Sequence, residues 1–211
     1  MEQRQAVIYL RQNDPILAEV IERIGNDSLE LSYYQEKLDL LTALSQAIIF
    51  QQISTKVATK IFKRFVLLYQ ESHTELTAKA ILETPEDILR SVGISRPKIS
   101  YLKDLAGKIE QGLPSFAELS MMEDGAVIAS LTQVKGIGIW TAQMFLIFHL
   151  NRPDVLPVND LGIRSAIANL YHLNSLPDAK TIEKLAQKWQ PHRSLACRYL
   201  WRSLAINDRV S

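Results

Sequence analysis

The residue of this sequence best placed to carry out a reaction is Asp160. It follows the extended approach that Pro157 imposes, and it stands where a new helix is predicted to begin. A carboxylate beside the free N–H groups of a helix start is held ionised and fixed in place. Such an anion is suited to stabilising a cationic sugar transition state. The alternative is that Asp160 is only a helix cap, and the two roles are compatible.

No second acid is obvious near Asp160. Hydrolysis of a glycosidic bond usually needs one, because the leaving group must be protonated. Asp154 is close in sequence but lies beyond Pro157, and we expect it to be a surface turn residue. A purine that is alkylated on a ring nitrogen already carries positive charge and leaves with little protonation. A single aspartate can then suffice, either by stabilising the sugar cation or by orienting a water at C1′.

A glycine-containing turn precedes Asp160 in the sequence. Residues 131–140 (LTQVKGIGIW) predict the end of a short helix, a turn at Gly136 and Gly138, and the start of an amphipathic helix. Two glycines let the backbone pass close to a phosphate, and the N-terminus of the next helix faces the anion. Ile137 would join the two helices from inside. The pattern is typical of a helix-hairpin-helix DNA-binding element, although a plain Gly-X-Gly helix cap is the alternative.

Aromatic residues are candidates for holding a base that has been turned out of a duplex. An extruded cationic base is recognised by stacking and by cation–π attraction, which electron-rich rings provide. The ordinary alternative for each of these residues is packing in the core. The candidates are Trp140, Trp201, Phe50 and Tyr199.

A stripe of basic residues lies on one face of the helix predicted after Ser54. Ser54 is expected to cap this helix, or to offer its hydroxyl and the neighbouring N–H groups to a phosphate. A basic stripe is usually a solvated helix face, and DNA contact is the alternative. The stripe falls at i, i+4, i+7 and i+8 and consists of Lys56, Lys60, Lys63 and Arg64.

Other polar residues are weaker candidates. His192 and Arg193, next to Trp189, are possible phosphate contacts. The histidines show no pairing at metal-ligand spacing, and His149 is expected to cap or pack at the end of an apolar helix. The only cysteine, Cys197, is expected to be a small core residue.

The composition is that of an ordinary globular chain. Its 211 residues carry a net charge of +1 and are 47% hydrophobic. Residues 132–211 hold ten lysines and arginines against five aspartates and glutamates, so phosphate contacts are expected mainly there. No apolar run approaches the length of a membrane span, and the first residues lack the order of a signal peptide. We expect an intracellular protein, in the cytoplasm of a bacterium or the nucleus of a eukaryote.

Apolar residues recur at three- and four-residue spacing almost everywhere, which predicts an all-α fold. We expect a single unit over residues 1–211 with two helical lobes around a DNA-binding cleft, and the helix-hairpin-helix near residues 127–150. The predicted helices lie near residues 3–12, 15–24, 38–52, 54–70, 75–82, 85–91, 95–111, 115–120, 123–131, 139–150, 160–172, 178–188 and 192–206.

These motifs together resemble the helix-hairpin-helix superfamily of DNA glycosylases, and most closely the 3-methyladenine DNA glycosylase II type. Residues 134–142 (VKGIGIWTA), followed by 157–160 (PVND), match the hairpin and the catalytic loop in order and distance. The similarity runs from about Leu40 to Trp201. It includes the segments 48–54 (IIFQQIS), 92–95 (VGIS) with Lys98, and 189–194 (WQPHRS).

The resemblance implies a role for each matching position. Asp160 corresponds to the catalytic aspartate, and Gly136 and Gly138 to the phosphate-facing glycines. No cofactor is required, but a structural Na⁺ or K⁺ is implied in the hairpin, bound by the backbone carbonyls of Thr132, Val134 and Ile137. The positions expected to contact DNA are Gln51, Gln52, Ser54, Lys135, Gly136, Ile137, Gly138 and Thr141.

Trp140 occupies a discriminating position of this superfamily. Bifunctional members have a lysine there, which attacks the sugar as a Schiff-base nucleophile, and tryptophan cannot form an imine. A single cysteine also rules out the iron–sulfur centre of other members. Gln51 and Gln52 occupy the stretch that inserts a wedge residue into the DNA, where some relatives have leucine. The resemblance implies a monofunctional enzyme that leaves an intact abasic strand.

We therefore expect a DNA glycosylase that excises alkylated purines, such as 3-methyladenine and 7-methylguanine, by base flipping and hydrolysis. It would initiate base excision repair and act as a monomer on double-stranded DNA that contains a damaged base. One alternative keeps this class of enzyme but changes the substrate to a deaminated or etheno base. A second alternative is a non-catalytic helix-hairpin-helix DNA-binding protein, and a third is a plain helical interaction module.

Overall fold

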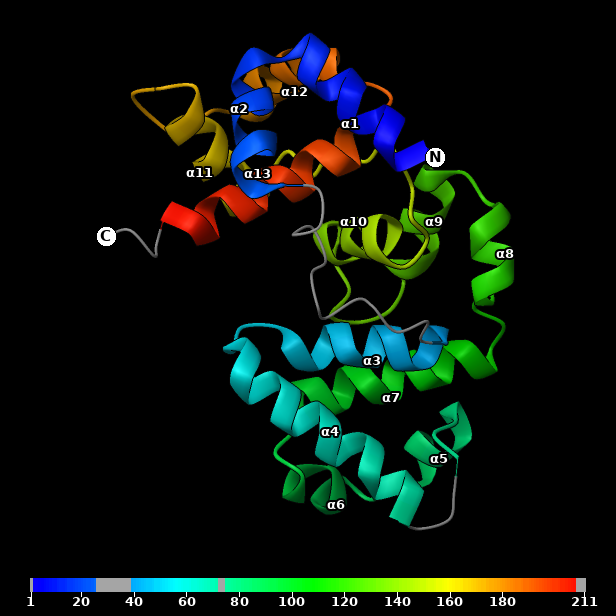
Figure 1. The fold of residues 1–211 in the computed structure, drawn as a ribbon. Coiled ribbons are helices and arrows are strands. Elements are labelled where there is room, and N and C mark those ends of the chain that lie inside the picture. Colours follow the sequence, from blue (N-terminus) through cyan, green and yellow to red (C-terminus); the bar gives the residue numbers. More distant parts are fainter. Residues whose placement is uncertain (1, 26–38, 72–74, 208–211) are drawn as a thin grey trace. The chain divides into compact units, whose positions relative to one another are not determined.

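The computed structural model describes residues 2–25, 39–71 and 75–207 of the chain. Every regular element in these residues is a helix, which confirms the predicted all-α class (Figure 1). The chain divides into two compact units: unit 1 comprises Met1–Glu36 and Leu146–Ser211, and unit 2 comprises Lys37–Phe145. Within the described ranges, no helix is both long and apolar enough to cross a lipid bilayer.

Unit 1 is built from the two ends of the chain. Its helices are α1 (Glu2–Asn13), α2 (Pro15–Ile24), α11 (Leu161–Leu170), α12 (Ala179–Ala186), the 3₁₀ helix η2 (Gln187–Trp189) and α13 (Arg193–Asn207). α13 packs against α2 and α11, and α1 packs against α2. Apolar residues recur on one face of α2, at Leu17, Val20, Ile21 and Ile24, and all four are buried. The core of unit 1 therefore forms where α2 meets α13.

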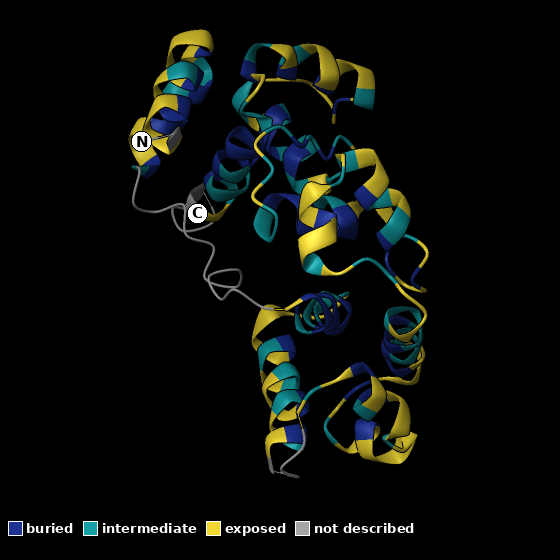
Figure 2. Cartoon of the chain, turned by 90° about the vertical axis from the view of Figure 1, so that its right-hand side faces the viewer, coloured by how far each residue is buried: buried dark blue, intermediate teal, exposed yellow. Residues whose placement is uncertain are grey.

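Unit 2 contains the middle of the chain. Its helices are α3 (Leu40–Phe50), α4 (Thr55–Glu71), α5 (Ala78–Glu83), α6 (Glu86–Ser91), α7 (Arg96–Glu110), α8 (Phe116–Met121), α9 (Asp124–Leu131) and α10 (Ile139–Phe148). The last residues of α10 belong to unit 1. α7 packs against both α3 and α5, and its residues Ile99, Leu102, Leu105 and Ala106 are buried at helical spacing. Figure 2 shows that buried and exposed residues alternate along the helices of the chain. The opposite face of α7 remains available for the loops of unit 2.

All the predicted helices are present, with boundaries that differ by a few residues. The difference that matters most for the site is at the end of α3, which is predicted to reach residue 52 but ends at Phe50. Gln51 is extended, with φ −59° and ψ 134°, and Gln52 has a positive φ of 58°. A residue in the left-handed region cannot continue a right-handed helix, so residues 51 and 52 form a turn.

A buried carboxylate joins three segments of unit 1. Asp14 caps α2 and has 0% of its surface exposed. It accepts hydrogen bonds from Leu17 N (3.2 Å), from Trp189 Nε1 (2.7 Å) and from the Tyr171 hydroxyl, and Lys188 Nζ lies 3.0 Å away. Burial alone would raise the pKa of Asp14, but these donors outweigh burial and hold the pKa below its ordinary value of 3.8. The carboxylate is therefore ionised and paired inside the fold.

We predict that Asp14→Asn lowers the free energy of unfolding by about 2–4 kcal/mol at neutral pH, because buried donors lose their acceptor. Since the folded pKa lies below the unfolded one, the carboxylate stabilises the fold above about pH 4, and this stabilisation is lost as the pH falls through the folded pKa. The difference between wild type and variant should thus shrink below about pH 4. Denaturant unfolding at several pH values measures it. Asp178→Asn, at the exposed cap of α12, is the control, and an equal loss in both variants would contradict the prediction.

Candidate functional site

The glycine-containing turn between α9 and α10 has the predicted hairpin geometry. Ile137 N donates to Val134 O at 3.0 Å, and Ala142 N donates to Gly138 O at 3.0 Å. The Ile137 side chain is only 4% exposed, so it holds the two helices together from inside, as predicted. Gly136 and Gly138 lie on the surface. α10 begins directly after this turn, and the N-terminus of a helix is suited to binding an anion.

The two glycines of the turn have different physical reasons for lacking a side chain. Gly136 has a φ of +84°, and a Cβ atom built there would lie 2.3 Å from Cδ2 of Tyr101 on α7. Only glycine fits both constraints. At Gly138 a Cβ atom would meet nothing within 4 Å, so the fold itself leaves this position open. Gly136 is required by the protein, whereas Gly138 leaves room for a ligand.

Two further residues of α7 bind the hairpin. The carboxylate of Asp104 accepts a hydrogen bond from Lys135 N at 2.7 Å, and the Lys135 Nζ lies 3.3 Å from the Ser100 hydroxyl. The Gly136 carbonyl accepts a hydrogen bond from Gln51 Nε2 at 2.9 Å. The sequence of the hairpin gives no sign of these partners. In the sequence of α7, Tyr101 and Asp104 are spaced three residues apart and so share one helix face, which is the one local feature that could have suggested a common partner.

The side chain of Lys98 on α7 binds the backbone of the turn at Gln51 and Gln52. The ammonium nitrogen of Lys98 donates to the carbonyls of Ile49 (2.8 Å) and Gln51 (2.7 Å), and burial lowers the pKa of this lysine. The Gln52 side chain is exposed. Ser54 is also exposed, and its carbonyl accepts the first hydrogen bonds of α4, so it occupies the expected cap position.

Asp160 caps α11 in unit 1, as the sequence predicts. Its Oδ1 atom accepts two hydrogen bonds, one from Ile163 N and one from Trp201 Nε1, both at 2.8 Å. A Cβ atom at Gly162 would lie 3.0 Å from Trp201 Cδ1 and 3.1 Å from Asp160 Oδ1, so a side chain there would crowd both residues. The carboxylate is half-buried and its orientation is fixed by groups from two helices. It can stabilise a cation that forms beside it.

Trp201 has a role that the sequence does not reveal. It is a candidate for stacking on the base, but its indole nitrogen binds the carboxylate of Asp160. Its ring lies 5.7 Å from the ring of Phe148, at 33° to it, and remains half-buried. Stacking on a base stays a prediction for Trp201. The contact with Asp160 crosses 41 residues of sequence, which no local pattern encodes.

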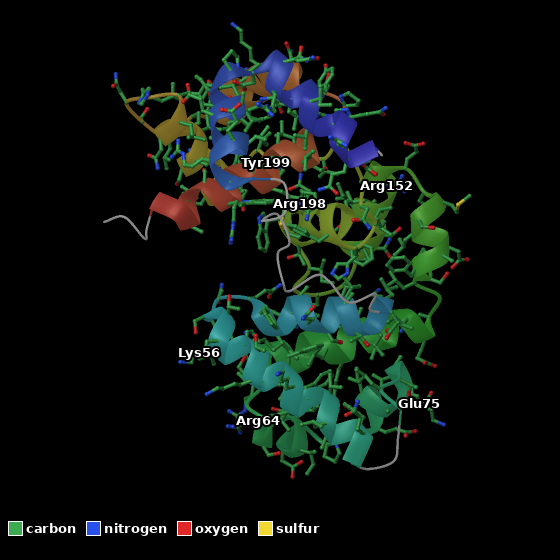
Figure 3. All side chains as sticks on the ribbon, viewed as in Figure 1. Lys56, Arg64, Glu75, Arg152, Arg198 and Tyr199 are labelled. Carbon is green, nitrogen blue, oxygen red and sulfur yellow. The ribbon has the colours of Figure 1, made fainter. Side chains whose placement is uncertain are left out.

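The other aromatic candidates differ in exposure. Trp140, in the first turn of α10, has 49% of its surface exposed, so it is available to a ligand. Phe50 is half-buried and packs edge to face on Phe62, with ring centres 6.3 Å apart. Tyr199 has 0% exposure in the core of unit 1 (Figure 3), which corrects its assignment to a base-binding site. The Thr141 side chain is also buried, so the predicted contact of this residue with DNA would be made by its backbone.

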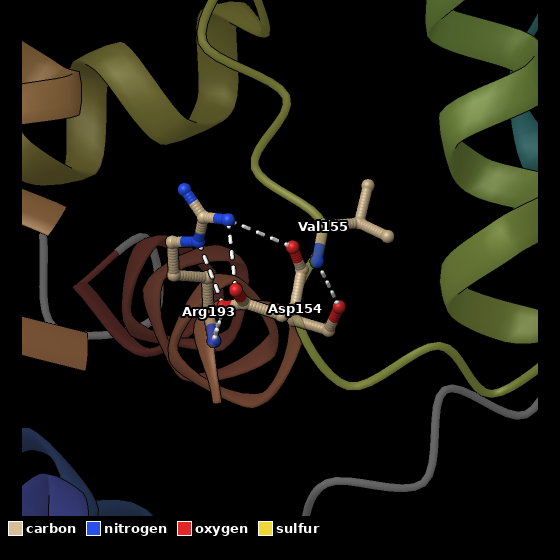
Figure 4. A network of polar contacts seen from close by, with 4 residues as sticks. Asp154, Val155 and Arg193 are labelled. Carbon is tan, nitrogen blue, oxygen red and sulfur yellow. Dashed lines mark hydrogen bonds and ion pairs between the residues drawn. The ribbon is translucent and has the colours of Figure 1, made fainter. Parts of the chain in front are cut away.

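Asp154 and Arg193 form an ion pair that corrects two expectations. Nε of Arg193 donates to Oδ1 of Asp154 at 2.7 Å, and Nη2 donates to Oδ2 at 2.8 Å (Figure 4). Arg193 N also binds the same carboxylate, and the Ser194 hydroxyl accepts from Val155 N at 2.9 Å. Asp154 is therefore not a simple surface turn residue, and the guanidinium of Arg193 is already paired with a carboxylate. The pair ties the start of α13 to the loop that leads to Asp160.

The remaining candidates differ in how far they are buried. The basic stripe of α4 (Lys56, Lys60, Lys63 and Arg64) is exposed, and Figure 3 shows Lys56 and Arg64 on this helix. Cys197 is buried in the core of unit 1, and burial raises the pKa of its thiol. His149 directly follows α10, where burial lowers the pKa of its imidazole to about 4.

A pocket of about 540 Å³ lies elsewhere in unit 1. Neither Asp160 nor Trp201 contributes to its wall, so it is not a candidate for the reaction site. Its lining residues come from α1, from the end of α10 and the loop after it, from His192 and from α13; they include Gln5, Arg152 and Arg198. In the described part of the chain, no group of three or more histidine, cysteine or acidic side chains is arranged to hold a metal ion.

Comparison with known proteins identifies a family and several relatives. Residues 45–192 match the family described as HhH-GPD superfamily base excision DNA repair protein. The chain is 34% identical over 205 residues to DNA-3-methyladenine glycosylase 1 of Schizosaccharomyces pombe, covering 97% of this chain and 89% of that protein. It is 30% identical over 192 residues to the putative DNA-3-methyladenine glycosylase YfjP of Bacillus subtilis, covering 89% and 65%.

A solved structure has a similar fold along nearly the whole chain. The S. pombe 3-methyladenine DNA glycosylase Mag1, solved in complex with abasic DNA, superimposes with a TM-score of 0.83 at 34% identity, covering 94% of this chain and 95% of that one. The DNA-3-methyladenine glycosidase of Bacillus halodurans superimposes with a TM-score of 0.75 at 33% identity, covering 92% and 86%.

The two hairpin glycines provide a matched pair of variants. Gly136→Ala should lower the free energy of unfolding by about 1–3 kcal/mol, because it places a methyl group against Tyr101 at a positive φ. Gly138→Ala should leave it within about 0.5 kcal/mol of wild type but should weaken binding to abasic-site DNA. Denaturant unfolding and fluorescence anisotropy measure the two effects. Equal stability of the two variants would show that Tyr101 does not constrain the hairpin.

Proposed function

Since the chain belongs to the HhH-GPD superfamily of base excision DNA repair proteins, we propose that it is a DNA glycosylase that excises alkylated purines, such as 3-methyladenine and 7-methylguanine. The observation that carries this proposal is the fixed carboxylate of Asp160, with Oδ1 bound by Ile163 N and Trp201 Nε1. The substrate named for the S. pombe relatives supports alkylated purines over deaminated or etheno bases.

In the proposed reaction, Asp160 stabilises the sugar while the base departs. The bond between C1′ and the base nitrogen breaks with its electron pair on the base, which neutralises the positive charge of the alkylated ring. The sugar acquires oxocarbenium character, and the nearby carboxylate lowers the energy of that cation. A water molecule then adds to C1′ and loses a proton, which leaves an abasic site. The two donors on Oδ1 keep the anion oriented, so little reorganisation is needed during the reaction.

In this proposal, the hairpin binds the phosphate backbone of the DNA. The backbone at Gly136 and Gly138 and the start of α10 are exposed and suited to a phosphate, and the exposed Gln52 lies in a turn that is bonded to the same hairpin. One copy of the chain contains all of these groups, so we infer that it acts as a monomer on double-stranded DNA with a single damaged base.

We also propose a monovalent cation, Na⁺ or K⁺, in the hairpin. The carbonyls that would bind it belong to Thr132, Val134 and Ile137. The Val134 oxygen accepts one hydrogen bond, from Ile137 N at 3.0 Å, and a carbonyl oxygen has a second lone pair for an ion. When bound, the cation would stiffen the turn and add positive charge near the phosphate.

The exchange of Asp160 for asparagine tests the catalytic role. Asparagine can still cap α11 and accept from Trp201, but it has no negative charge. Asp160→Asn should reduce the release of methylated purines from alkylated DNA by about 10²-fold or more, because a preorganised charge is lost. Affinity for abasic-site DNA should change little. Chromatography of released bases and anisotropy measure the two quantities.

A matched control is Asp178→Asn, which changes the same residue type at the start of α12. Asp178 binds Thr181 N at 2.8 Å, is exposed, and has no contact with Trp201 in the structure. The Asp178→Asn variant should release methylated purines as fast as the wild-type protein. If Asp160→Asn released bases as fast as Asp178→Asn, Asp160 would be only a helix cap.

The presence of Trp140 predicts a monofunctional reaction. An indole cannot form an imine with C1′, so incubation with lesion-containing duplex and sodium borohydride should trap no covalent complex. The product strand should stay intact until it is treated with alkali, and gel electrophoresis shows both results. A borohydride-trapped adduct, or nicking without alkali, would mean that another amine of the chain acts as a nucleophile.

A further inference from the structure

We propose that Lys98 is a positioning residue for the proposed glycosylase, because it holds the turn at Gln51 and Gln52 in register with the DNA-binding hairpin. Lys98 lies on α7 and is not expected to touch the substrate. It would act through the turn, whose exposed Gln52 is placed to fill the gap that an everted nucleotide leaves in the duplex. This role rests on the proposed function.

The contacts of Lys98 explain why a lysine stands there. α3 ends at Phe50, and the last carbonyls of a helix have no partner within it. The Lys98 ammonium donates to Ile49 O at 2.8 Å and to Gln51 O at 2.7 Å, one on each side of the helix end. A cation at a helix C-terminus is favourable, and charge-assisted hydrogen bonds are stronger than neutral ones. One side chain thus fixes the direction in which the chain leaves α3.

The contacts of Lys98 help to maintain an unusual backbone conformation at Gln52. Its φ of 58° is in the left-handed region, which a residue with a Cβ atom rarely adopts. The Gln52 side chain is exposed, so its own packing does not enforce this conformation. The backbone on its N-terminal side is held by Lys98, and on its C-terminal side Ser54 starts α4. Residues held in such conformations by their surroundings cluster at functional sites.

A second bond connects the same turn to the hairpin. Gln51 Nε2 donates to the Gly136 carbonyl at 2.9 Å, while its own carbonyl accepts from Lys98. Tyr101 lies against Gly136, and Asp104 binds Lys135 N at 2.7 Å. The α7 residues that make these contacts, 98, 101 and 104, are spaced three apart and share one face of the helix.

One rigid helix therefore contacts both of the loops that are expected to meet DNA. The hairpin would bind the backbone of the strand, and the Gln52 turn would enter the base stack. Filling the gap offsets the free-energy cost of unstacking and unpairing a base in a duplex. A single strand has no paired stack to repair. Loss of Lys98 should consequently impair excision from duplex DNA far more than excision from single-stranded DNA.

The test compares Lys98→Met and Lys98→Arg with Lys103→Met on methylated duplex and methylated single-stranded DNA. Lys103 is a matched control on the same helix, with Nζ 3.3 Å from the Leu82 carbonyl and no contact with either loop in the structure. Lys98→Met should slow single-turnover excision from duplex by about 10–100-fold, the effect expected of an ångström-scale displacement. Its rate on single-stranded DNA should stay within about twofold of wild type, whereas Lys98→Arg and Lys103→Met should resemble wild type on both substrates.

A second measurement reports on the unstacking of DNA bases at the gap, and it does not depend on catalysis. The fluorescence of 2-aminopurine opposite an abasic site reports unstacking when the protein binds, and Lys98→Met should reduce this signal at saturation. If Lys98→Met is too unstable to purify, Gln51→Ala, which removes the bond to Gly136, should show the same preferential loss on duplex, to a smaller extent.

The possible outcomes separate the two proposals. Equal losses on both substrates, or no loss on either, with an unchanged 2-aminopurine signal, would overturn the positioning role of Lys98 while leaving the glycosylase intact. A wild-type protein that releases no base from either substrate would overturn the proposed function, and the 2-aminopurine signal alone would then decide whether Lys98 positions the turn.

Discussion

Two hydrogen bonds to one oxygen of Asp160 are the constraint on which the proposed chemistry depends. The backbone of Ile163 supplies one and the indole of Trp201 supplies the other, so the carboxylate is oriented by two helices of unit 1. Gly162 leaves room for this close approach, because a Cβ atom there would lie only 3.0 Å from Trp201 and 3.1 Å from Asp160. The loop before Asp160 is fixed in turn by the Asp154–Arg193 pair at the start of α13. A catalytic charge held in this way needs little rearrangement when a cation forms.

Unit 2 differs from unit 1, because the group that it is proposed to present to DNA is the backbone of a turn and not a side chain. A phosphate-binding turn has exposed N–H groups, and it holds its shape only if something behind it does so. α7 supplies that support through Tyr101 against Gly136 and through Asp104 on Lys135 N. Ile137 adds an apolar anchor from within the hairpin. The exposed surface therefore includes the backbone of both glycines, and the residues of α7 that define its geometry lie behind it.

The sequence predicts the helices and the position of Asp160 at a helix start well, because these depend on local signals. Helical periodicity locates the helices, Pro157 and Asp160 mark a helix start, and the glycine pattern identifies the hairpin. The contacts between distant segments are not predicted: Trp201 on Asp160 spans 41 residues, and Lys98 on Gln51 spans 47. Tyr199 shows the converse difficulty. An aromatic on a helix that carries a site residue looks like a ligand-binding group until its burial is known.

Three N-terminal caps of this chain show why local sequence alone does not reveal a catalytic residue. Asp14, Asp160 and Asp178 each accept a hydrogen bond from the backbone three residues later. Asp14 is completely buried, and its charge is paired with further donors that stabilise the fold. Asp178 is exposed, so water and ions screen its charge. Asp160 lies between these extremes. A half-buried carboxylate has lost part of its water, and its charge therefore acts more strongly on a cation that approaches its open side.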